Sequence, residues 1–498
     1  MNGLTVTDLF CGAGGSSTGL VAAGYTVVIA ANHWARAIES HQLNHPNTDH
    51  SQADISQVDP RYFPTTDILW ASPECTNHSI AKGVKRQRAE DAALFDLNGT
   101  RPLVDEAANR SRATMWDVPR FAEHHRYKAI IIENVVDAHR WVQFPAWLLA
   151  MELLGYQHEI VWLNSMHAQG AGLPAPQSRD RMYVVFWRKD LVTAKNPRPR
   201  LEQWTRPRAV CPNDGEVRAV QSFKKAEAWG RYRAQYVYRC PKCAAVIEPA
   251  WLPASSAIDW SIRGERIGDR KKPLADKTRL RIERGIERYW RPIVVAAAGN
   301  TYDSASGKGG NYFRAYSVDD TMPTQSTTVQ HGVAVPPLVV PVEGREGKFA
   351  ASALDPLRTQ STRAETAIVI PLRNHGVAKP ASTPMDTVAA NGNHHALVMR
   401  NNEGGAEMTT PVVEPLRALT TAGHQSLLAA EPISLDVDDV EFRMLEPDEI
   451  KRGMAFPADY VLLGSKREQV KQSGNAVTPP AARDLGHAVA EYLQAVAA

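Results

Sequence analysis

The chain has 498 residues, 43% of them hydrophobic, which is enough for two or three separate cores. Its formal net charge of +3 neither indicates nor excludes a nucleic-acid partner, because such binding depends on a local basic surface. No stretch approaches the roughly 20 apolar residues that a membrane-spanning helix needs, and we expect no secretory signal. The five sparse cysteines favour a reducing, cytoplasmic compartment over a disulfide framework.

Residues 1 to about 190 alternate short apolar strands with helical stretches, which predicts a doubly wound α/β sheet. In open parallel sheets, functional side chains follow the carboxyl ends of the strands. Helices are expected at 15–23 and 34–44. Strands are expected at 4–9, 26–31, 67–71, 129–133, 159–164 and 182–187.

The composition changes after Lys189, where prolines mark a linker and an insertion rich in Arg, Lys and Trp follows. A degenerate repeat then occupies 292–428, with its signatures 28 to 35 residues apart. Most copies lead into a β-branched run, so we expect each unit to be a strand-turn-strand that stacks on the next. Helical patterning returns at 447–455 and 481–495. The signatures start at Thr321, Pro356, Pro384 and Pro415.

Chemically distinctive residues gather at the expected strand ends. Cys75 follows one strand and Glu133 ends another, while Arg179 and Arg181 precede a third. A thiolate adding to C6 of cytosine makes C5 nucleophilic enough to accept a methyl group. A carboxyl group at N3 and a guanidinium at O2 would stabilise the same charge shift. The set therefore indicates covalent methylation of a cytosine.

Each of these residues also has a structural interpretation when it is taken alone. Cys75 could be an ordinary buried cysteine, Glu133 a strand-end cap, and the two arginines part of a solvated turn. The occurrence of all of them at strand ends favours the chemical interpretation. The polar, charged segment from 84 to 112 follows Cys75, and we expect it to be a lid over the site or a solvated loop.

The chain resembles the DNA (cytosine-5) methyltransferase family, because several of its motifs occur in the order that is typical of that family. The resemblance implies an α/β, Rossmann-like S-adenosylmethionine-dependent methyltransferase sheet with a β-rich target-recognition lobe. It also implies attack by Cys75 on a cytosine flipped out of duplex DNA. The motifs are DLFCGAGG at 8–15, ENV at 133–135, QSRDR at 177–181, RMLEPDE at 443–449, FPADY at 456–460 and KQSGNAVTP at 471–479.

The resemblance also assigns roles around the methyl donor, S-adenosylmethionine. Phe10 would pack against its adenine, and Gly12 and Gly14 would face its methionine part. Asp54 would meet the adenine amino group. Asn475 would help to join the two lobes near the cleft.

Three features depart from the family pattern. The family has P-P-C-Q around its nucleophile, whereas this chain places Glu74 before Cys75. A neighbouring carboxylate is expected to raise the pKa of the thiol. Asn32 stands where the family has an acidic residue for the ribose hydroxyls, and an amide can still accept one hydrogen bond. The segment after Cys75 is also longer than is typical.

A second cysteine group lies in the insertion. Cys211 and Asp214 precede the C-P-x-C turn of Cys240 and Cys243, a spacing typical of zinc ribbons with Asp214 in place of a fourth cysteine. A ribbon with Cys3Asp-bound zinc and a decayed ribbon without metal both fit this pattern. Basic and aromatic residues between the two pairs fit either nucleic-acid contacts or one face of a small sheet.

The resemblance divides the chain into four parts. Residues 1–190 are expected to form the catalytic lobe, which 429–498 completes. Residues 191–290 form an insertion with a zinc-ribbon-like element at 211–243. The repeat-bearing region 291–428 is expected to recognise the target.

The expected partner is duplex DNA, and the family suggests a monomer encoded by a prokaryote or a phage. The sequence leaves open whether a cognate restriction nuclease accompanies it. Two alternatives are an RNA cytosine-5 methyltransferase and a DNA-binding protein that has lost catalysis. Glu74 and Asn32 favour the last alternative, whereas intact Cys75, Glu133 and Arg181 argue against it.

Overall fold

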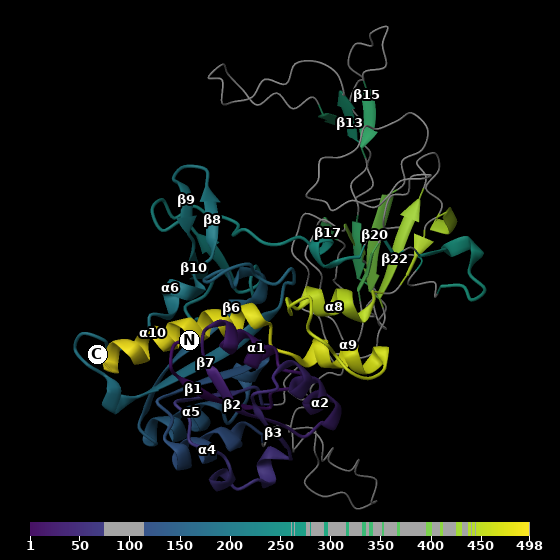
Figure 1. The fold of residues 1–498 in the computed structure, drawn as a ribbon. Coiled ribbons are helices and arrows are strands. Elements are labelled where there is room, and N and C mark those ends of the chain that lie inside the picture. The colour runs from purple at the N-terminus through teal and green to yellow at the C-terminus, as the bar shows by residue number, and fades with distance from the viewer. Residues whose placement is uncertain are drawn as a thin grey trace, which may run out of the picture. The chain divides into compact units, whose positions relative to one another are not determined.

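A computed structural model describes residues 1–73, 114–259, 261–262, 264–274, 279, 437–439, 441–443 and 445–497, with short strands between 293 and 430. The chain divides into two compact units, Met1–Trp251 with Met454–Ala498, and Leu252–Gly453 (Figure 1). The boundary after Trp251 falls inside the predicted insertion. The four-part division expected from the sequence stays a prediction.

The first unit is built on a seven-stranded sheet in the order β3-β2-β1-β4-β5-β7-β6. The first five strands are parallel, and β7 runs antiparallel to both β5 and β6. The α/β, Rossmann-like fold expected from the sequence is therefore confirmed. The strands are β1 (Thr5–Leu9), β2 (Thr26–Asn32), β3 (Asp49–Gln52), β4 (Ile68–Ala71), β5 (Ala129–Val135), β6 (Tyr156–Asn164) and β7 (Asp180–Arg188).

Helices cover both faces of this sheet (Figure 1). On one face α1 (Gly15–Ala22) and α10 (Pro479–Ala497) pack on apolar side chains of β1, β4 and β5. On the other, α4 (Asp117–His125) and α5 (Phe144–Leu153) cover the alternate residues of the same strands. Because successive strand residues face opposite sides, the two cores divide the β5 run AIII between them. Helix α2 (Ala35–Asn44) lies beside β2 and β3.

Two glycines of α1 allow the C-terminal segment to pack closely against it. A Cβ atom on Gly15 would overlap the carbonyl oxygen of Val477, and one on Gly19 would overlap that of Pro479. Only a residue without a side chain tolerates such an approach of backbone to backbone. Residues far apart in the sequence thus pack together in the first unit.

The described strands of the second unit are short and form sheets of two, three and six strands, as expected for a β-rich region. Strands β15 (His331–Ala334), β19 (Thr366–Ile368) and β20 (His395–Arg400) coincide with runs predicted to follow the repeat signatures. The signatures themselves lie outside the described residues, so the internal repeat stays a prediction. The other described strands between 293 and 430 are β13 (Ile293–Ala296), β14 (Ala315–Ser317), β16 (Leu338–Pro341), β17 (Ala351–Ser352), β21 (Thr409–Pro411) and β22 (Gln425–Ala430).

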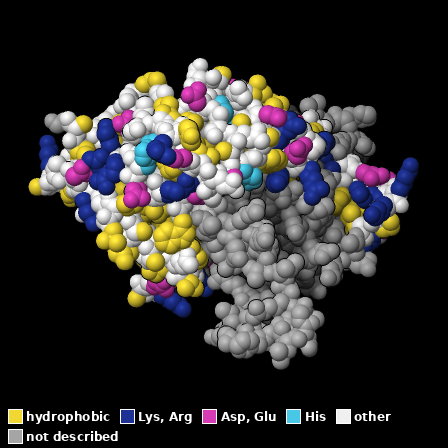
Figure 2. Space-filling model, turned by 90° about the horizontal axis from the view of Figure 1, so that it is seen from below, with side chains coloured by type: hydrophobic (Ala, Val, Ile, Leu, Met, Phe, Trp, Pro, Cys, Tyr) yellow, Lys and Arg dark blue, Asp and Glu magenta, His cyan; other side chains and the backbone are white. Residues whose placement is uncertain are grey.

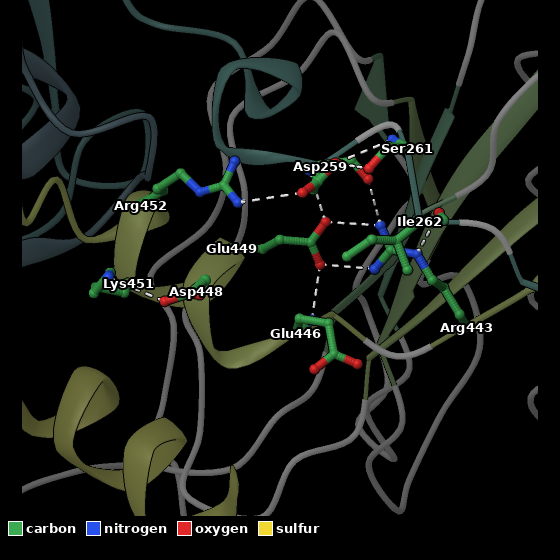
Figure 3. Close-up of polar contacts among 9 residues, drawn as sticks. All are labelled: Asp259, Ser261, Ile262, Arg443, Glu446, Asp448, Glu449, Lys451 and Arg452. Carbon is green, nitrogen blue, oxygen red and sulfur yellow. Dashed lines mark hydrogen bonds and ion pairs between the residues drawn. The ribbon is translucent and has the colours of Figure 1, made fainter. Parts of the chain in front are cut away.

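A buried ion pair organises the described part of the second unit near α8 (Pro447–Gly453) (Figure 3). The guanidinium of Arg443 binds both carboxylate oxygens of Glu449 at 2.7 Å. Glu449 also accepts the backbone N–H of Asp259 at 2.8 Å and that of Glu446 at 2.7 Å. The R-x-L-x-x-x-E spacing noted in the sequence therefore joins a strand end to a helix start.

The described surface mixes charges of both signs. Figure 2 shows Lys and Arg side chains interspersed with Asp and Glu over the described part of one face, in keeping with a net charge of +3. Among the described residues, no helix combines the length and apolarity that crossing a bilayer requires.

Candidate active site

The turn after β1 contains three residues in the left-handed region of backbone space. The φ angles are 58° at Phe10, 53° at Gly12 and 94° at Gly14. This conformation is uncommon for a bulky residue such as Phe10, and strain of this kind clusters at functional sites. No described atom lies within 4 Å of a Cβ built on Gly12, so a ligand can approach the backbone there. On Gly14 a Cβ would overlap the hydroxyl of Tyr460, which gives this glycine a packing reason of its own.

Asp8 lies beneath this turn and was missed by the sequence reasoning. It is fully buried, and its Oδ2 accepts hydrogen bonds from the hydroxyls of Ser16 and Ser17, both at 2.6 Å. Burial raises the pKa of Asp8 to about 7, although the serine hydrogen bonds oppose the shift. The available signal was a carboxylate within the predicted strand TVTDL, which is buried from its second residue onward.

Asn32 and Asp54 come together at the edge formed by the ends of β2 and β3. Asn32 ends β2 opposite Gln52, and its carbonyl oxygen accepts the N–H of Ala53 at 3.2 Å. Its side-chain oxygen accepts the N–H of Trp34 at 2.9 Å. The exposed Asp54 caps a short 3₁₀ helix, where it accepts the N–H of Ser56 at 3.1 Å. The structure thus brings these two predicted ligand-binding residues into one neighbourhood.

Glu133 and Arg181 form an ion pair across the β5–β7 ladder. The Nε atom of Arg181 lies 2.7 Å from Oε1 of Glu133, and both side chains are almost buried. A second guanidinium nitrogen of Arg181 donates to the carbonyl of Asp180 at 2.9 Å. A carboxyl group and a guanidinium held side by side can engage two neighbouring polar atoms of one planar base.

The chain leaves β4 beside this pair. Pro73 follows the end of β4, and its carbonyl oxygen lies 3.4 Å from the side-chain nitrogen of Asn134, the residue after Glu133. The N–H of Ser72 donates to the carbonyl of Leu9 at 3.1 Å, which ties this segment to the β1 turn as well. Cys75 comes two residues after Pro73 and lies outside the described residues, as do Glu74 and the predicted lid at 84–112. Its role as the nucleophile stays a prediction.

Arg179 points to the C-terminal segment. Its side chain is buried, and Nη2 donates to the carbonyls of Gly474 at 3.2 Å and Ala476 at 3.0 Å. These carbonyls lie at the end of α9 (Lys466–Asn475), where a cation also complements the helix dipole. Asn475 lies between them and is exposed. The side chain of Arg179 is therefore hydrogen-bonded to the residues on either side of Asn475, whereas Arg181 forms an ion pair with Glu133.

The predicted metal ligands come together in the first unit. One ligand atom from each of Cys211, Asp214, Cys240 and Cys243 lies within 4.8 Å of all the others. The first two lie at the turn between β8 (Arg208–Cys211) and β9 (Gly215–Arg218). The other two follow β11 (Tyr236–Arg239). A Cys/Asp cluster is thus present as the spacing predicted.

The chain is similar to bacterial Type II methyltransferases over part of its length. It is 27% identical to M.AgeI of Thalassovita gelatinovora over 188 residues, which cover 36% of this chain and 38% of that enzyme. It is 28% identical to M.HhaI of Haemophilus parahaemolyticus over 196 residues, which cover 38% of this chain and 51% of that enzyme. The matches therefore span about half, or less, of each relative's length.

A family comparison covers more of the chain. The family described as C-5 cytosine-specific DNA methylase matches residues 4–227 and 358–491. The match includes the β1 turn, the Glu133–Arg181 pair and the C-terminal segment that completes the first unit. Together the two matched segments make up more than half of the 498 residues, and the chain belongs to the C-5 cytosine-specific DNA methylase family.

Proposed function

We propose that this chain transfers a methyl group from S-adenosylmethionine to C5 of cytosine in a specific sequence of duplex DNA. The observation that carries the proposal is the Glu133–Arg181 ion pair, which lies beside the end of β4 from which Cys75 follows. Membership of the C-5 cytosine-specific DNA methylase family supports the reaction, and the Type II relatives favour DNA over RNA as the substrate.

The proposed mechanism begins when the target cytosine leaves the base stack, because C6 is unreachable inside a duplex. The Cys75 thiolate forms a bond to C6, and the electron pair of the C5–C6 double bond becomes available at C5. Glu133 holds a proton at N3, and Arg181 donates a hydrogen bond to O2. C5 then forms a bond to the methyl carbon while the methyl–sulfur bond of the donor breaks and its electron pair stays on sulfur. A base removes the C5 proton, the double bond re-forms and the Cys75 thiolate leaves.

The cofactor turn fits the proposed methyl donor. S-Adenosylmethionine, when bound, supplies an electrophilic methyl group. Open space beside Gly12 lets a ligand approach the backbone, and Phe10 offers a ring in a strained, left-handed position. Asn32 and the exposed Asp54 offer polar groups at the neighbouring strand end. The proposal includes a structural zinc ion at the cluster formed by Cys211, Asp214, Cys240 and Cys243.

The test is nucleoside mass spectrometry on nucleic acids from methylation-free bacteria that express the chain or its Cys75→Ala variant. Additional 5-methylcytosine in DNA with the parent chain only would support both the reaction and the nucleophile. Bisulfite sequencing of the same DNA would then give the recognised site. New 5-methylcytosine confined to RNA would overturn the DNA assignment, and binding of S-adenosylmethionine without turnover would indicate a lost activity.

A further inference from the structure

We propose that Cys211, Asp214, Cys240 and Cys243 bind one zinc ion, and that this ion stabilises the β5-β7-β6 edge region of the sheet, which contains Glu133 and Arg181. The ion would act through residues 208–247 of the first unit, which we call the cysteine module. The metal-binding part of the proposal is independent of methyl transfer, whereas the choice of this edge as the catalytic one rests on the proposed function.

The spacing of the ligand atoms matches a metal site better than a disulfide. The sulfurs of Cys211 and Cys243 are 3.4 Å apart, which is much longer than the roughly 2.0 Å of a disulfide bond. Tetrahedral zinc with Zn–S bonds of about 2.3 Å places its sulfurs roughly 3.8 Å apart. Asp214 Oδ2 lies 3.1 Å from the Cys240 sulfur and 3.5 Å from that of Cys211. Three thiolates and one carboxylate form a donor set that zinc accepts.

The turns that present these ligands also supply hydrogen bonds to sulfur. The backbone N–H of Lys242 donates to the Cys240 sulfur at 3.4 Å, and the side-chain amide of Asn213 donates to that of Cys243 at 3.8 Å. Such contacts orient metal ligands and offset the negative charge of the thiolates. Ala244 follows the C-P-x-C turn with a φ of 58°, so the chain reverses at once and returns antiparallel to β11. The turn is thus shaped around its two cysteines.

The module has little secondary structure with which to hold itself rigid. Its ladders are β8–β9 and β10 (Val220–Phe223) with β11, each of two strands of four residues. Two-stranded ladders of this length are at best marginally stable alone. An ion that joins the β8–β9 turn to the turn after β11 would link the two ladders at one point. Small metal-bound domains gain folding free energy in this way.

The module contacts the residues beside the candidate catalytic pair. The backbone N–H of Tyr232 donates to the Asp180 carboxylate at 3.0 Å, and Asp180 precedes Arg181. The guanidinium of Arg231 pairs at 2.6 Å with Asp137, which lies in the 3₁₀ helix after β5 and has a side chain only 8% exposed. Two neighbouring residues of the module therefore hold one carboxylate at the start of β7 and one just after the end of β5.

Aromatic contacts extend the same interface. The Arg140 guanidinium lies 3.9 Å from the centre of the Trp229 ring, a favourable cation–π distance. The indole N–H of Trp162, on β6, donates to the carbonyl of Ala228 at 2.8 Å. The ring of His167 meets the rings of Tyr232 and Tyr238 edge-on at 4.6 and 5.0 Å. Tyr238 lies two residues before Cys240, so the ring contacts run from the sheet to the metal ligands.

The first test measures metal content directly. The purified full chain, dialysed against metal-free buffer, should retain one zinc ion per molecule by plasma mass spectrometry, and Cys243→Ser and Asp214→Ala should retain almost none. Cys243 is exposed, so its loss should affect the core less than loss of the buried Cys211 or Cys240. Lys242→Ala on the same turn is the matched control and should keep the zinc. Asp214→Cys should keep it as well, because it completes a four-cysteine site.

The second test asks whether the zinc ion stabilises the β5-β7-β6 edge region of the sheet. Cobalt(II) replaces zinc as a probe whose thiolate charge-transfer absorption reports its ligands, and a chelator then removes it. Hydrogen exchange should accelerate in 136–140 and 180–188 after removal, while β2, next to the opposite edge strand β3, serves as the internal reference. Equal zinc content in the parent chain and Cys243→Ser would show that the four residues are not the zinc site. Metal release without faster exchange at 136–140 and 180–188 would show that the ion does not stabilise this region of the sheet.

Discussion

The Nε atom of Arg181 lies 2.7 Å from Oε1 of Glu133, and the two side chains are each 11% exposed. The pair spans the antiparallel β5–β7 ladder, in which Arg181 is opposite Val135 and Glu133 is opposite Tyr183. Because both charges are largely removed from water, each depends on the other for compensation. A change at either residue should therefore disturb both.

The first prediction concerns this pair. Glu133→Gln keeps the size of the side chain but removes its acidic proton, so kcat for methyl transfer should fall about 10²–10⁴-fold, the usual range for a general acid–base group. Arg181→Lys keeps a positive charge but loses the planar guanidinium, so kcat should also fall. The rate is measured as transfer of a tritium-labelled methyl group from S-adenosylmethionine to DNA.

A matched control lies at the other end of β7. Arg188 pairs with Asp190 on the surface, and Arg188→Lys should leave kcat within about 2-fold because exposed pairs contribute little. If Cys75→Ser abolished methyl transfer while Glu133→Gln left it unchanged, Glu133 would have no place in the mechanism.

The second prediction concerns Cys75. Duplex DNA with 5-fluorocytosine at the target should form a covalent complex with the chain that survives denaturing electrophoresis. After methyl transfer, C5 of this base carries fluorine in place of the proton, so the elimination that expels the thiolate is blocked. Cys75→Ala should form no such complex, whereas Cys243→Ser should still form it. A complex of equal yield with Cys75→Ala would assign the nucleophile to another residue.

The apolar strands of the sheet could be predicted from the sequence because their side chains are buried on both faces. All six predicted strands form, each within three residues of its expected ends. Strand β3 was missed because its sequence DHSQ is polar and only partly buried, so backbone pairing with β2 alone defines it. Helix α9 was missed although Ser465 and Glu468 form a capping box at its start, a signal that was readable.

The candidate site was harder to predict because its contacts join distant segments. Arg179 and Arg181 are two residues apart, a spacing that would place both on one face of a strand. Arg179 precedes the first residue of β7 and turns to α9, while only Arg181 reaches Glu133. These residues could be picked out in the sequence, but their partners could not. The partner of Arg181 depends on β7 running antiparallel to β5, and the partners of Arg179 lie almost 300 residues later in the chain.

The third prediction separates structure from catalysis at Arg179. Arg179→Met removes the donor to the carbonyls of Gly474 and Ala476, so the free energy of unfolding should fall by about 1–3 kcal/mol. The fraction that stays folded should methylate DNA with a nearly unchanged kcat. Urea denaturation gives the stability, and active-site titration with the fluorinated DNA normalises the rate. Unchanged stability with a rate loss as large as that of Glu133→Gln would make Arg179 a catalytic residue instead.

The fourth prediction is a pH dependence caused by His167. Burial lowers the pKa of this imidazole to about 3, and among the described residues neither ring nitrogen has a hydrogen-bond partner. Between pH 3 and the usual value near 6.5 the unfolded chain binds the proton and the folded chain does not, so stability rises with pH in that window. His167→Phe should fill the space between the tyrosine rings without this titration.

Urea denaturation at pH 7 and pH 5 checks the size of the effect. The parent chain should lose about 2 kcal/mol more than His167→Phe on going from pH 7 to pH 5, from about 1.4 kcal/mol per pH unit below the unfolded pKa. His124 is exposed, so His124→Gln is the matched control and should behave as the parent chain does. Equal losses in the parent chain and His167→Phe would show that His167 is already protonated or hydrated when folded.

The fifth prediction concerns Arg443 and Glu449 (Figure 3). Their side chains are 8% and 0% exposed, so removal of one partner leaves an uncompensated charge in the second unit. Glu449→Gln should therefore lower the free energy of unfolding by about 3–5 kcal/mol. The double variant Arg443→Met/Glu449→Leu should lower it by less than the sum of the losses caused by Arg443→Met alone and Glu449→Leu alone.

Arg452 and Asp259 are 3.9 Å apart and partly exposed, so the control variant Arg452→Ala should lower the free energy of unfolding by less than about 1 kcal/mol. A double-mutant cycle in urea gives the coupling energy, and a value near zero would show that the Arg443–Glu449 pair does not hold this region together.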